Sequence, residues 1–376
     1  MQIDFLNPRS IICFIAILQG LIFAILLIIR GFRQKTKADL WLALLLILLC
    51  STLITPLIGF ANVYDLNQWL TYFPFAIFFS SGVCVWFYTL NLTDSTRKFQ
   101  TKDLYFFIPT LIYLAVRFFL FGHSVEWKNW FDDTYGKYFE TSVFITEFFW
   151  NLTFLYFSIR HYQKYRSWLN ENFSDIEKLK FDWLRNFLYI ATSVLILSAL
   201  FDFTNSFIFH LSYKQYFYFE LVLAFSTYYL AVAGYLRSKT IELRFTEKEA
   251  EEIEERKTLL SEKDLEKLKT KLQILMETEK VYREPNLTLN DLSKELGVNA
   301  SVLSYAINNG FHKNFNDFVN EFRISEVKEK LKNSDDSTLL GAAFDCGFNS
   351  KATFNRAFKK FTGVSPKEFQ DNSTTK

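Results

Sequence analysis

Four ionisable side chains lie inside apolar stretches long enough to cross a membrane: Arg117, Glu147, Asp202 and Glu220. A charge at such a depth is costly, so residues of this kind usually face the interior of a helix bundle. The four could converge in a cavity open to the outside, with three carboxylates around one guanidinium. Such a cavity could bind a small-molecule or peptide signal. The alternative is that they reach the membrane surface or form structural ion pairs. The sequence leaves both interpretations open.

A second set of polar side chains lies near the C-terminus, on the exposed faces of two predicted helices. The set comprises Asn299, Ser301, Ser304, Tyr305, Lys351, Thr353, Asn355, Arg356, Lys359 and Lys360. Side chains near the start of a recognition helix reach base edges in the major groove of DNA. Arg356 is suited to donate two hydrogen bonds to guanine O6 and N7. Lys359 and Lys360, with Lys313 and Arg323, are suited to phosphate oxygens.

Two helix-turn-helix patterns must position these side chains. The predicted helices cover residues 289–296, 300–308, 339–346 and 350–361. Gly297 and Gly347 stand at the two turns, because glycine tolerates the left-handed backbone that a sharp corner between helices requires. Gly363 ends the last of these helices, and Pro366 begins a short final one. The sequence therefore predicts a tandem helix-turn-helix domain.

Several residues of this region form a more specific pattern. They are Phe315, Phe318, Phe322-Arg323-Ile324, Leu331, Ala343, Gly347-Phe348, Phe354, Arg356, Phe358-Lys359-Lys360, Gly363-Val364-Ser365-Pro366 and Phe369. With this pattern, residues 285–370 resemble the AraC/XylS family of bacterial transcription regulators. The resemblance implies that both second helices enter successive major-groove segments on one face of double-stranded DNA. The first motif departs from the family in having no arginine at its exposed recognition positions, so readout there would use amide, hydroxyl and apolar contacts.

The chain before this domain is predicted to cross a lipid bilayer seven times. Half of all residues are apolar and 44 are Phe. About 20 apolar residues are needed to span a hydrocarbon core. Seven stretches qualify: about 10–30, 38–60, 68–91, 104–121, 140–160, 184–207 and 216–236.

The distribution of basic residues predicts the orientation of these spans. Loops on one side hold Arg30, Arg33, Lys35, Lys37, Arg97, Lys98, Lys102, Arg160, Lys164, Arg166, Lys178, Lys180 and Arg185. The opposite loops hold only Arg9, Lys128, Lys137 and Lys214. Because cytoplasmic loops carry the excess of Lys and Arg, we expect the N-terminus outside and everything after Arg237 in the cytoplasm. The four ionisable residues of the spans then fall in the outer half of the membrane.

Residues 237–284 are predicted to form a charged, helical linker, with an acidic run at 247–255. An apolar stripe follows: Leu259, Leu265, Leu268, Leu272, Leu275 and Met276. The stripe either packs on the DNA-binding domain or pairs with a second copy as a short coiled coil. A homodimer would double the number of phosphate contacts.

Other functional classes find little support. The four cysteines have no CxxC spacing and the four histidines are dispersed, so neither a disulfide framework, a metal site nor a cofactor is expected. No nucleophile elbow or phosphate-binding loop is present, so the chain is not expected to be an enzyme. The alternative is a transporter or integral-membrane enzyme with a regulatory helix-turn-helix domain, since carboxylates within a membrane can couple protons.

The sequence thus predicts an all-α protein: a seven-helix transmembrane sensor (1–236), a linker (237–284) and a tandem helix-turn-helix domain (285–376). The predicted function is that of a membrane-bound transcription regulator in the inner membrane of a bacterium. It would couple an external or membrane signal to sequence-specific promoter binding.

Overall fold

The computed structural model describes residues 3–77, 79–177, 179–236, 245, 262–333 and 338–374, and these are helical without any strand. The chain forms two compact units. Unit 1 comprises Met1–Tyr162 and Asp182–Arg244, and unit 2 comprises Gln163–Phe181 and Phe245–Lys376. Unit 2 thus includes a stretch from the middle of the sequence.

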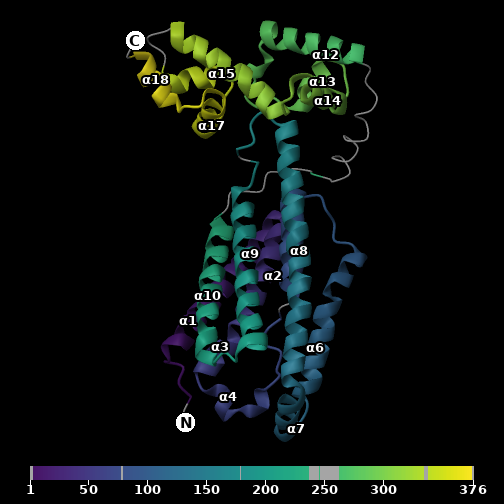
Figure 1. Ribbon diagram of the computed structural model, residues 1–376, viewed down its shortest axis with the longest axis vertical. Helices are drawn as coiled ribbons and strands as arrows, with labels where there is room; N and C mark the ends of the chain where they lie inside the picture. Colours follow the sequence, from purple (N-terminus) through teal and green to yellow (C-terminus); the bar gives the residue numbers. More distant parts are fainter. Residues whose placement is uncertain are drawn as a thin grey trace. The chain divides into compact units, whose positions relative to one another are not determined.

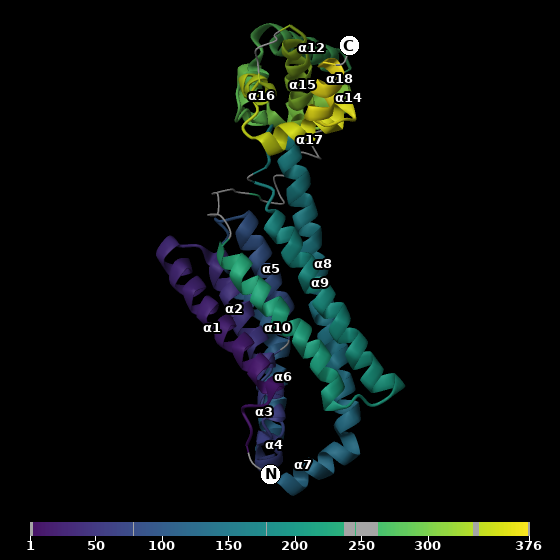
Figure 2. The same cartoon turned by 90° about the vertical axis from the view of Figure 1, so that its left-hand side faces the viewer.

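Unit 1 is a bundle of long apolar helices. Its helices are α1 (Pro8–Gln34), α2 (Lys37–Thr52), α3 (Ile54–Phe60), α4 (Val63–Leu66), α5 (Ser80–Thr93), α6 (Ile108–Phe121), α7 (Val125–Phe131), α8 (Lys137–Asn172, whose end belongs to unit 2), α9 (Asp182–Phe203) and α10 (Tyr213–Leu236). Helices α1, α2, α9 and α10 run alongside one another, and the short helices α3, α4 and α7 lie at the end of the bundle where the chain begins (Figure 1 and Figure 2).

Six helices of the described residues are long and apolar enough to cross a membrane. The stretch predicted as a further span, residues 68–91, has a different structure: its helix α5 begins only at Ser80 and has 14 residues. Pro74 accounts for this, because proline has no amide hydrogen to donate and disfavours helical backbone in the residue before it. Nearly all of α5 is buried.

The two ends of the segment that contains α5 nevertheless contact different parts of unit 1. Before it, the Trp69 carbonyl accepts a hydrogen bond of 2.8 Å from Lys128, which follows α6. After it, the Arg97 carbonyl accepts one of 2.5 Å from Lys37, which lies at the turn between α1 and α2.

Packing of α1 against α2 and α10 holds the bundle together. Small residues permit a close approach, because a Cβ added to Gly20 would lie 2.4 Å from the Cys50 sulfur. At the end of α1, Arg30 donates two hydrogen bonds to the buried Asp39 and further ones to the carbonyls of Gly234 and Tyr235. The opposite face of α1 exposes a row of apolar side chains: Ile11, Phe14, Ile15, Leu18 and Ile22. Such a surface suits insertion in a membrane.

Unit 2 is built around one long helix, α15 (Phe315–Asn333), which contributes to two apolar cores. The other helices are α12 (Glu262–Ile274), α13 (Leu289–Glu295), α14 (Ala300–Phe311), α16 (Leu339–Asp345), α17 (Lys351–Thr362) and α18 (Pro366–Thr374). One core joins α12, α13 and α14 to the first half of α15, and the other joins α16 and α17 to its second half. Figure 1 shows α15 between the two groups.

The apolar stripe of the linker packs on this domain. Leu268, Leu272, Leu275 and Met276 are buried, and the last three belong to the core of α13, α14 and α15. Of the two interpretations that the sequence left open, the described structure therefore supports packing on the domain. Leu259 and the acidic run 247–255 lie outside the described residues.

Candidate functional site

Two pairs of short helices in unit 2 correspond to the predicted helix-turn-helix patterns. In the first pair, α13 begins with Thr288, whose side chain accepts a hydrogen bond from the Asp291 amide while the Asp291 side chain accepts one in return. Gly297 then turns the chain with a φ of +65°. Asn299 caps α14 by accepting a hydrogen bond of 2.9 Å from the Ser301 amide. Reciprocal capping of this kind fixes where a helix begins.

The second pair is more tightly constrained at its turn. Gly347, between α16 and α17, has a φ of +93°, and a Cβ there would lie 2.6 Å from the Tyr282 carbonyl oxygen. The side chain of Ser350 accepts a hydrogen bond from the Thr353 amide at the start of α17. Gly363, with a φ of +81°, ends that helix. Only glycine fits both the backbone and the space at position 347.

The first pair offers few free groups for base contacts. Asn299 is exposed but serves as the helix cap. Ser304, predicted to face DNA, is 3% exposed and accepts a hydrogen bond from Asn308, so that prediction is wrong. Ser301 and Tyr305 are half-buried. The helical periodicity alone did not reveal which polar side chain of α14 would be buried.

The second pair presents a cationic face. Lys351, Asn355, Arg356, Lys359 and Lys360 are all exposed on α17, while Phe354 and Phe358 are buried on its opposite side. This alternation gives α17 one surface for packing and one for a partner.

Three of the predicted DNA contacts on α17 already have acidic partners within unit 2. Thr353 is buried and donates a hydrogen bond of 3.0 Å to Asp175. Arg356 forms an ion pair with Glu177, and Lys360 forms one of 2.6 Å with Asp317.

Arg323, predicted to contact phosphate, is fully buried. Its guanidinium donates hydrogen bonds of 2.7 Å to the carbonyls of Tyr282 and Glu284 and one of 3.2 Å to the Ser174 hydroxyl. Burial lowers the pKa of Arg323 to about 10, so it keeps its charge at neutral pH. The phosphate assignment is therefore wrong, because this side chain holds the domain together instead. Lys313, the other predicted phosphate contact outside α17, forms an ion pair with Glu321.

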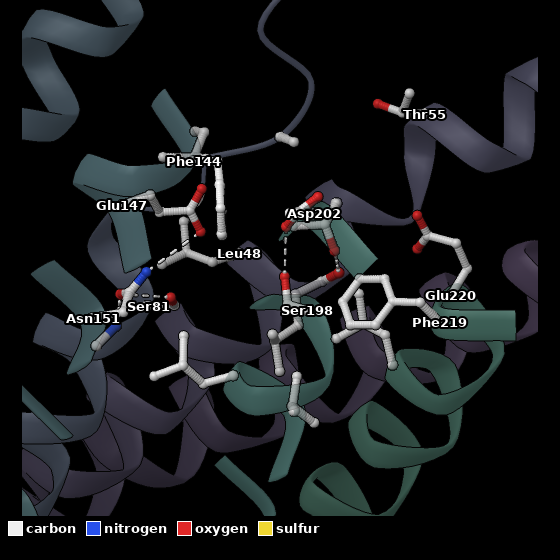
Figure 3. Close-up of a pocket in the computed structure, with 18 of the residues that line it drawn as sticks. Leu48, Thr55, Ser81, Phe144, Glu147, Asn151, Ser198, Asp202, Phe219 and Glu220 are labelled. Atoms are coloured by element: carbon white, nitrogen blue, oxygen red, sulfur yellow. Dashed lines mark hydrogen bonds between the residues drawn. The ribbon is translucent and has the colours of Figure 1, made fainter. Parts of the chain in front are cut away.

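A second candidate site is a cavity of about 480 Å³ within unit 1. Arg117, Glu147, Asp202 and Glu220, the four ionisable residues of the predicted spans, all line it. Figure 3 shows the carboxylates of Glu147 and Asp202 directed into the same space from α8 and α9. The rest of the wall is mostly apolar, including Leu48, Phe144 and Phe219. The volume is in the range of pockets that hold small organic ligands.

The charges in this cavity differ from the predicted arrangement. Arg117 forms an ion pair of 3.0 Å with Glu140 and lies over the rings of Tyr72 and Tyr113. Glu140 also lines the cavity and was not among the predicted residues, because it stands at the very start of a predicted span. The guanidinium is therefore paired with a carboxylate outside the predicted set.

The other carboxylates have neutral partners. Glu147 accepts a hydrogen bond of 3.4 Å from Asn151, and Asp202 accepts hydrogen bonds from Ser198 and Tyr216. The Oε2 atom of Glu220 is buried and has no hydrogen-bond partner among the described residues. Buried polar atoms are usually satisfied, so the cavity has unused capacity to accept hydrogen bonds.

Comparison with known proteins identifies the C-terminal domain. A family model described as a helix-turn-helix domain, of the AraC type, matches residues 292–372. The chain is also similar to proteins of Staphylococcus aureus strains COL, MSSA476 and N315 that are each named an uncharacterized HTH-type transcriptional regulator, with 35% identity over 85 residues. The similarity covers 23% of this chain and 11% of each relative. No solved structure matches the chain.

Unit 2 contains an AraC-type helix-turn-helix domain, the kind of domain found in DNA-binding transcription regulators. Unit 1 adds six apolar helices that suggest insertion in a membrane.

Proposed function

We propose that the chain is a membrane-bound, sequence-specific transcription regulator that couples a signal at unit 1 to promoter binding by unit 2. The observation that carries the proposal is the exposed cationic face of α17, in a domain matched by an AraC-type model, on the same chain as the apolar bundle. In this assignment Arg356 reads a guanine, Asn355 contacts a neighbouring base, and Lys351, Lys359 and Lys360 bind phosphates.

The first helix pair has a different part in the proposal. Asn299, Ser301 and Tyr305 would add amide, hydroxyl and aromatic contacts in the neighbouring major-groove segment. Both pairs together form the tandem helix-turn-helix unit, and two copies of the chain would bind as a homodimer.

We place the N-terminus outside the cell and unit 2 in the cytoplasm of a bacterium, with seven crossings of the inner membrane. The crossing not made by one of the six long helices is the segment that contains α5. Hydrogen bonds join its two ends to Lys128 of α7 and to Lys37 of α2, which stand on opposite sides of the predicted topology. The excess of Lys and Arg on the side of Lys37 supports this orientation.

We assign the signal to the cavity of unit 1. Four carboxylates and one guanidinium line it, and that guanidinium is already paired with Glu140. The excess of carboxyl groups favours an organic cation, whose apolar part would contact Leu48, Phe144 and Phe219.

A ligand test can use matched probes. Tryptamine carries an ammonium group, whereas tryptophol has the same ring system with a hydroxyl in its place. In the full chain reconstituted in lipid discs, tryptamine should raise the unfolding temperature more than tryptophol. Asp202→Asn together with Glu220→Gln should abolish the difference, and Glu126→Gln, at an exposed position of α7, should retain it. Equal effects of the two probes would contradict the cation assignment.

DNA binding by the full chain in lipid discs tests the main proposal. We expect selective enrichment of a subset of genomic fragments, weakened by Arg356→Ala and unchanged by Lys267→Ala, an exposed cation of α12. Absence of any DNA binding at low salt would contradict the proposal.

The carboxylates of the cavity also support a second candidate function. Carboxylates inside a membrane bundle can couple protons, as in a transporter or an integral-membrane enzyme. Substrate uptake or turnover that survives deletion of residues 285–376 would favour that function over a regulator.

A further inference from the structure

The loop between α8 and α9, residues 173–181, is part of unit 2 and contacts the DNA-binding domain. Phe173 forms an antiparallel bridge with Thr288, and the Ser174 amide donates a hydrogen bond of 3.2 Å to the Leu287 carbonyl. Asn316 of α15 donates hydrogen bonds of 3.0 Å and 2.8 Å to the carbonyls of Phe173 and Ser174. The loop is thus bound by its backbone to the start of α13 and to α15.

Buried side chains add to this attachment. Ser174 is fully buried, and its hydroxyl accepts a hydrogen bond from the buried Arg323. Ile176 is buried as well. The Tyr165 hydroxyl, near the end of α8, donates a hydrogen bond of 2.6 Å to the Leu179 carbonyl. Contacts of this number and depth distinguish a docked segment from a surface loop, which ordinarily makes few of them.

Two acidic side chains of the docked loop meet α17. Asp175 accepts the hydrogen bond from Thr353, and Glu177 pairs with Arg356. A carboxylate and a nucleic acid compete for the same guanidinium, because Arg356 presents its donors in one fixed fork. Glu177 accepts a hydrogen bond from one terminal nitrogen of this guanidinium. While that contact lasts, Arg356 cannot turn all of its donors toward a guanine.

The charge state of the loop supports this competition. Burial opposes ionisation of Glu177, but hydrogen bonds from Arg356 and Lys180 outweigh it and lower the pKa of the carboxyl group. Glu177 is therefore negatively charged at neutral pH, as a phosphate would be.

We propose that the α8–α9 loop is an intramolecular inhibitor, which holds Thr353 and Arg356 of α17 and must leave them before unit 2 binds its specific DNA site. The inference rests on the proposed function, and it assigns the regulation of the same DNA-binding surface. Only chains with the loop released are competent to bind, so the apparent dissociation constant rises as the released fraction falls.

Neutralising the loop should strengthen DNA binding. In the full chain in lipid discs, Asp175→Asn with Glu177→Gln should lower the dissociation constant for the selected genomic fragment about threefold to tenfold, as the released fraction grows. Removing two negative charges also strengthens nonspecific attraction to DNA. Glu262→Gln with Glu329→Gln, two exposed acidic residues on α12 and α15, is therefore the matched control. An equal gain in both double variants would overturn the proposal.

A covalent lock gives the converse test. Asp175→Cys and Thr353→Cys place two thiols where the native side chains are hydrogen-bonded, and the four native cysteines are buried. Oxidation should join the two positions and weaken DNA binding at least tenfold, and reduction of the same sample should restore it. Failure of the disulfide to form, or equal binding by the oxidised and reduced forms, would overturn the inhibitory role.

The same sample separates this inference from the proposed function. If the reduced form binds DNA and the oxidised form binds equally well, the chain is a DNA-binding regulator without an inhibitory loop. If neither form nor the wild-type chain binds, the proposed function fails and the inhibitory role fails with it.

Discussion

The two helix pairs of unit 2 have similar lengths and turns but different surfaces. In the first, α14 has no charged side chain: its cap residue Asn299 is engaged by the backbone and Ser304 is buried. The second has four exposed cationic side chains on α17, and Arg356 among them contacts the acidic loop. We therefore expect discrimination between DNA sequences to be concentrated in α17, the helix on which the proposed inhibition acts.

The turns give the largest expected difference between the pairs. Gly347→Ala would place a Cβ 2.6 Å from the Tyr282 oxygen and 2.7 Å from the Arg283 oxygen, at a φ of +93°. We expect a loss of about 3 kcal/mol or more in stability. Gly297→Ala, with a φ of +65° and no atom within 4 Å, should cost only about 1 kcal/mol. Thermal unfolding of both variants measures the two losses, and equal losses would contradict the difference in packing.

Substitutions in the second helix pair should also affect base readout more than those in the first. Arg356→Ala should weaken binding to the selected site by about 1–3 kcal/mol and relax the preference at one base pair. Tyr305→Ala should have a smaller effect, because α14 offers no cationic group at its start. Both variants should be titrated against DNA sites with single base-pair changes. The protein should also carry Asp175→Asn and Glu177→Gln, because release of the loop would otherwise offset the loss of affinity. A larger effect of Tyr305→Ala would reverse our assignment.

The region joining the pairs should be sensitive to acid. Hydrogen bonds from Arg283 and Lys280 outweigh the effect of burial and lower the pKa of Glu326, on α15, to about 2. Because this pKa is depressed, its contribution to stability is complete above the ordinary value near 4.5 and is lost as the pH falls from there toward 2. Glu326→Gln should reduce stability at neutral pH by about 1–2 kcal/mol. The variant should also flatten the decline of the unfolding temperature below pH 4.5. A decline as steep as in wild type would show that other groups cause it.

The smallest expected effect concerns phosphate contacts. Lys351→Ala and Lys359→Ala should each reduce the slope of log affinity against log salt by about one, with no change in base preference. Ser301→Ala on the first pair should leave the slope unchanged. Binding measured at several salt concentrations gives these slopes. A changed slope for Ser301→Ala would place the first pair closer to the DNA backbone than we assign it.

Local signals in the sequence predicted the helices of unit 2 well. Turn glycines, cap residues and apolar spacing placed α13, α14, α16 and α17 within a few residues of their bounds. The sequence left open whether Arg117, Glu147, Asp202 and Glu220 share a cavity, and in the structure all four line the same one.

Contacts between distant parts of the chain were not predictable in this way. Arg323 looked like a phosphate contact because its partners, Tyr282, Glu284 and Ser174, lie 39 or more positions away. Glu177 and Arg356 are 179 positions apart, and no periodicity links them. The shortening of α5 had a local cause in Pro74, but the apolar run around it concealed that signal.

The docked loop also bears on how this protein can be recombined with others. A chimera cut at residue 237 or 285 would carry away both helix pairs and leave Ser174 behind. The buried Arg323 would lose the hydrogen bond to that hydroxyl, and Arg356 would lose its ion pair with Glu177. A graft intended to keep its regulation should therefore include residues 173–181, because the transferable module consists of two separate stretches of sequence.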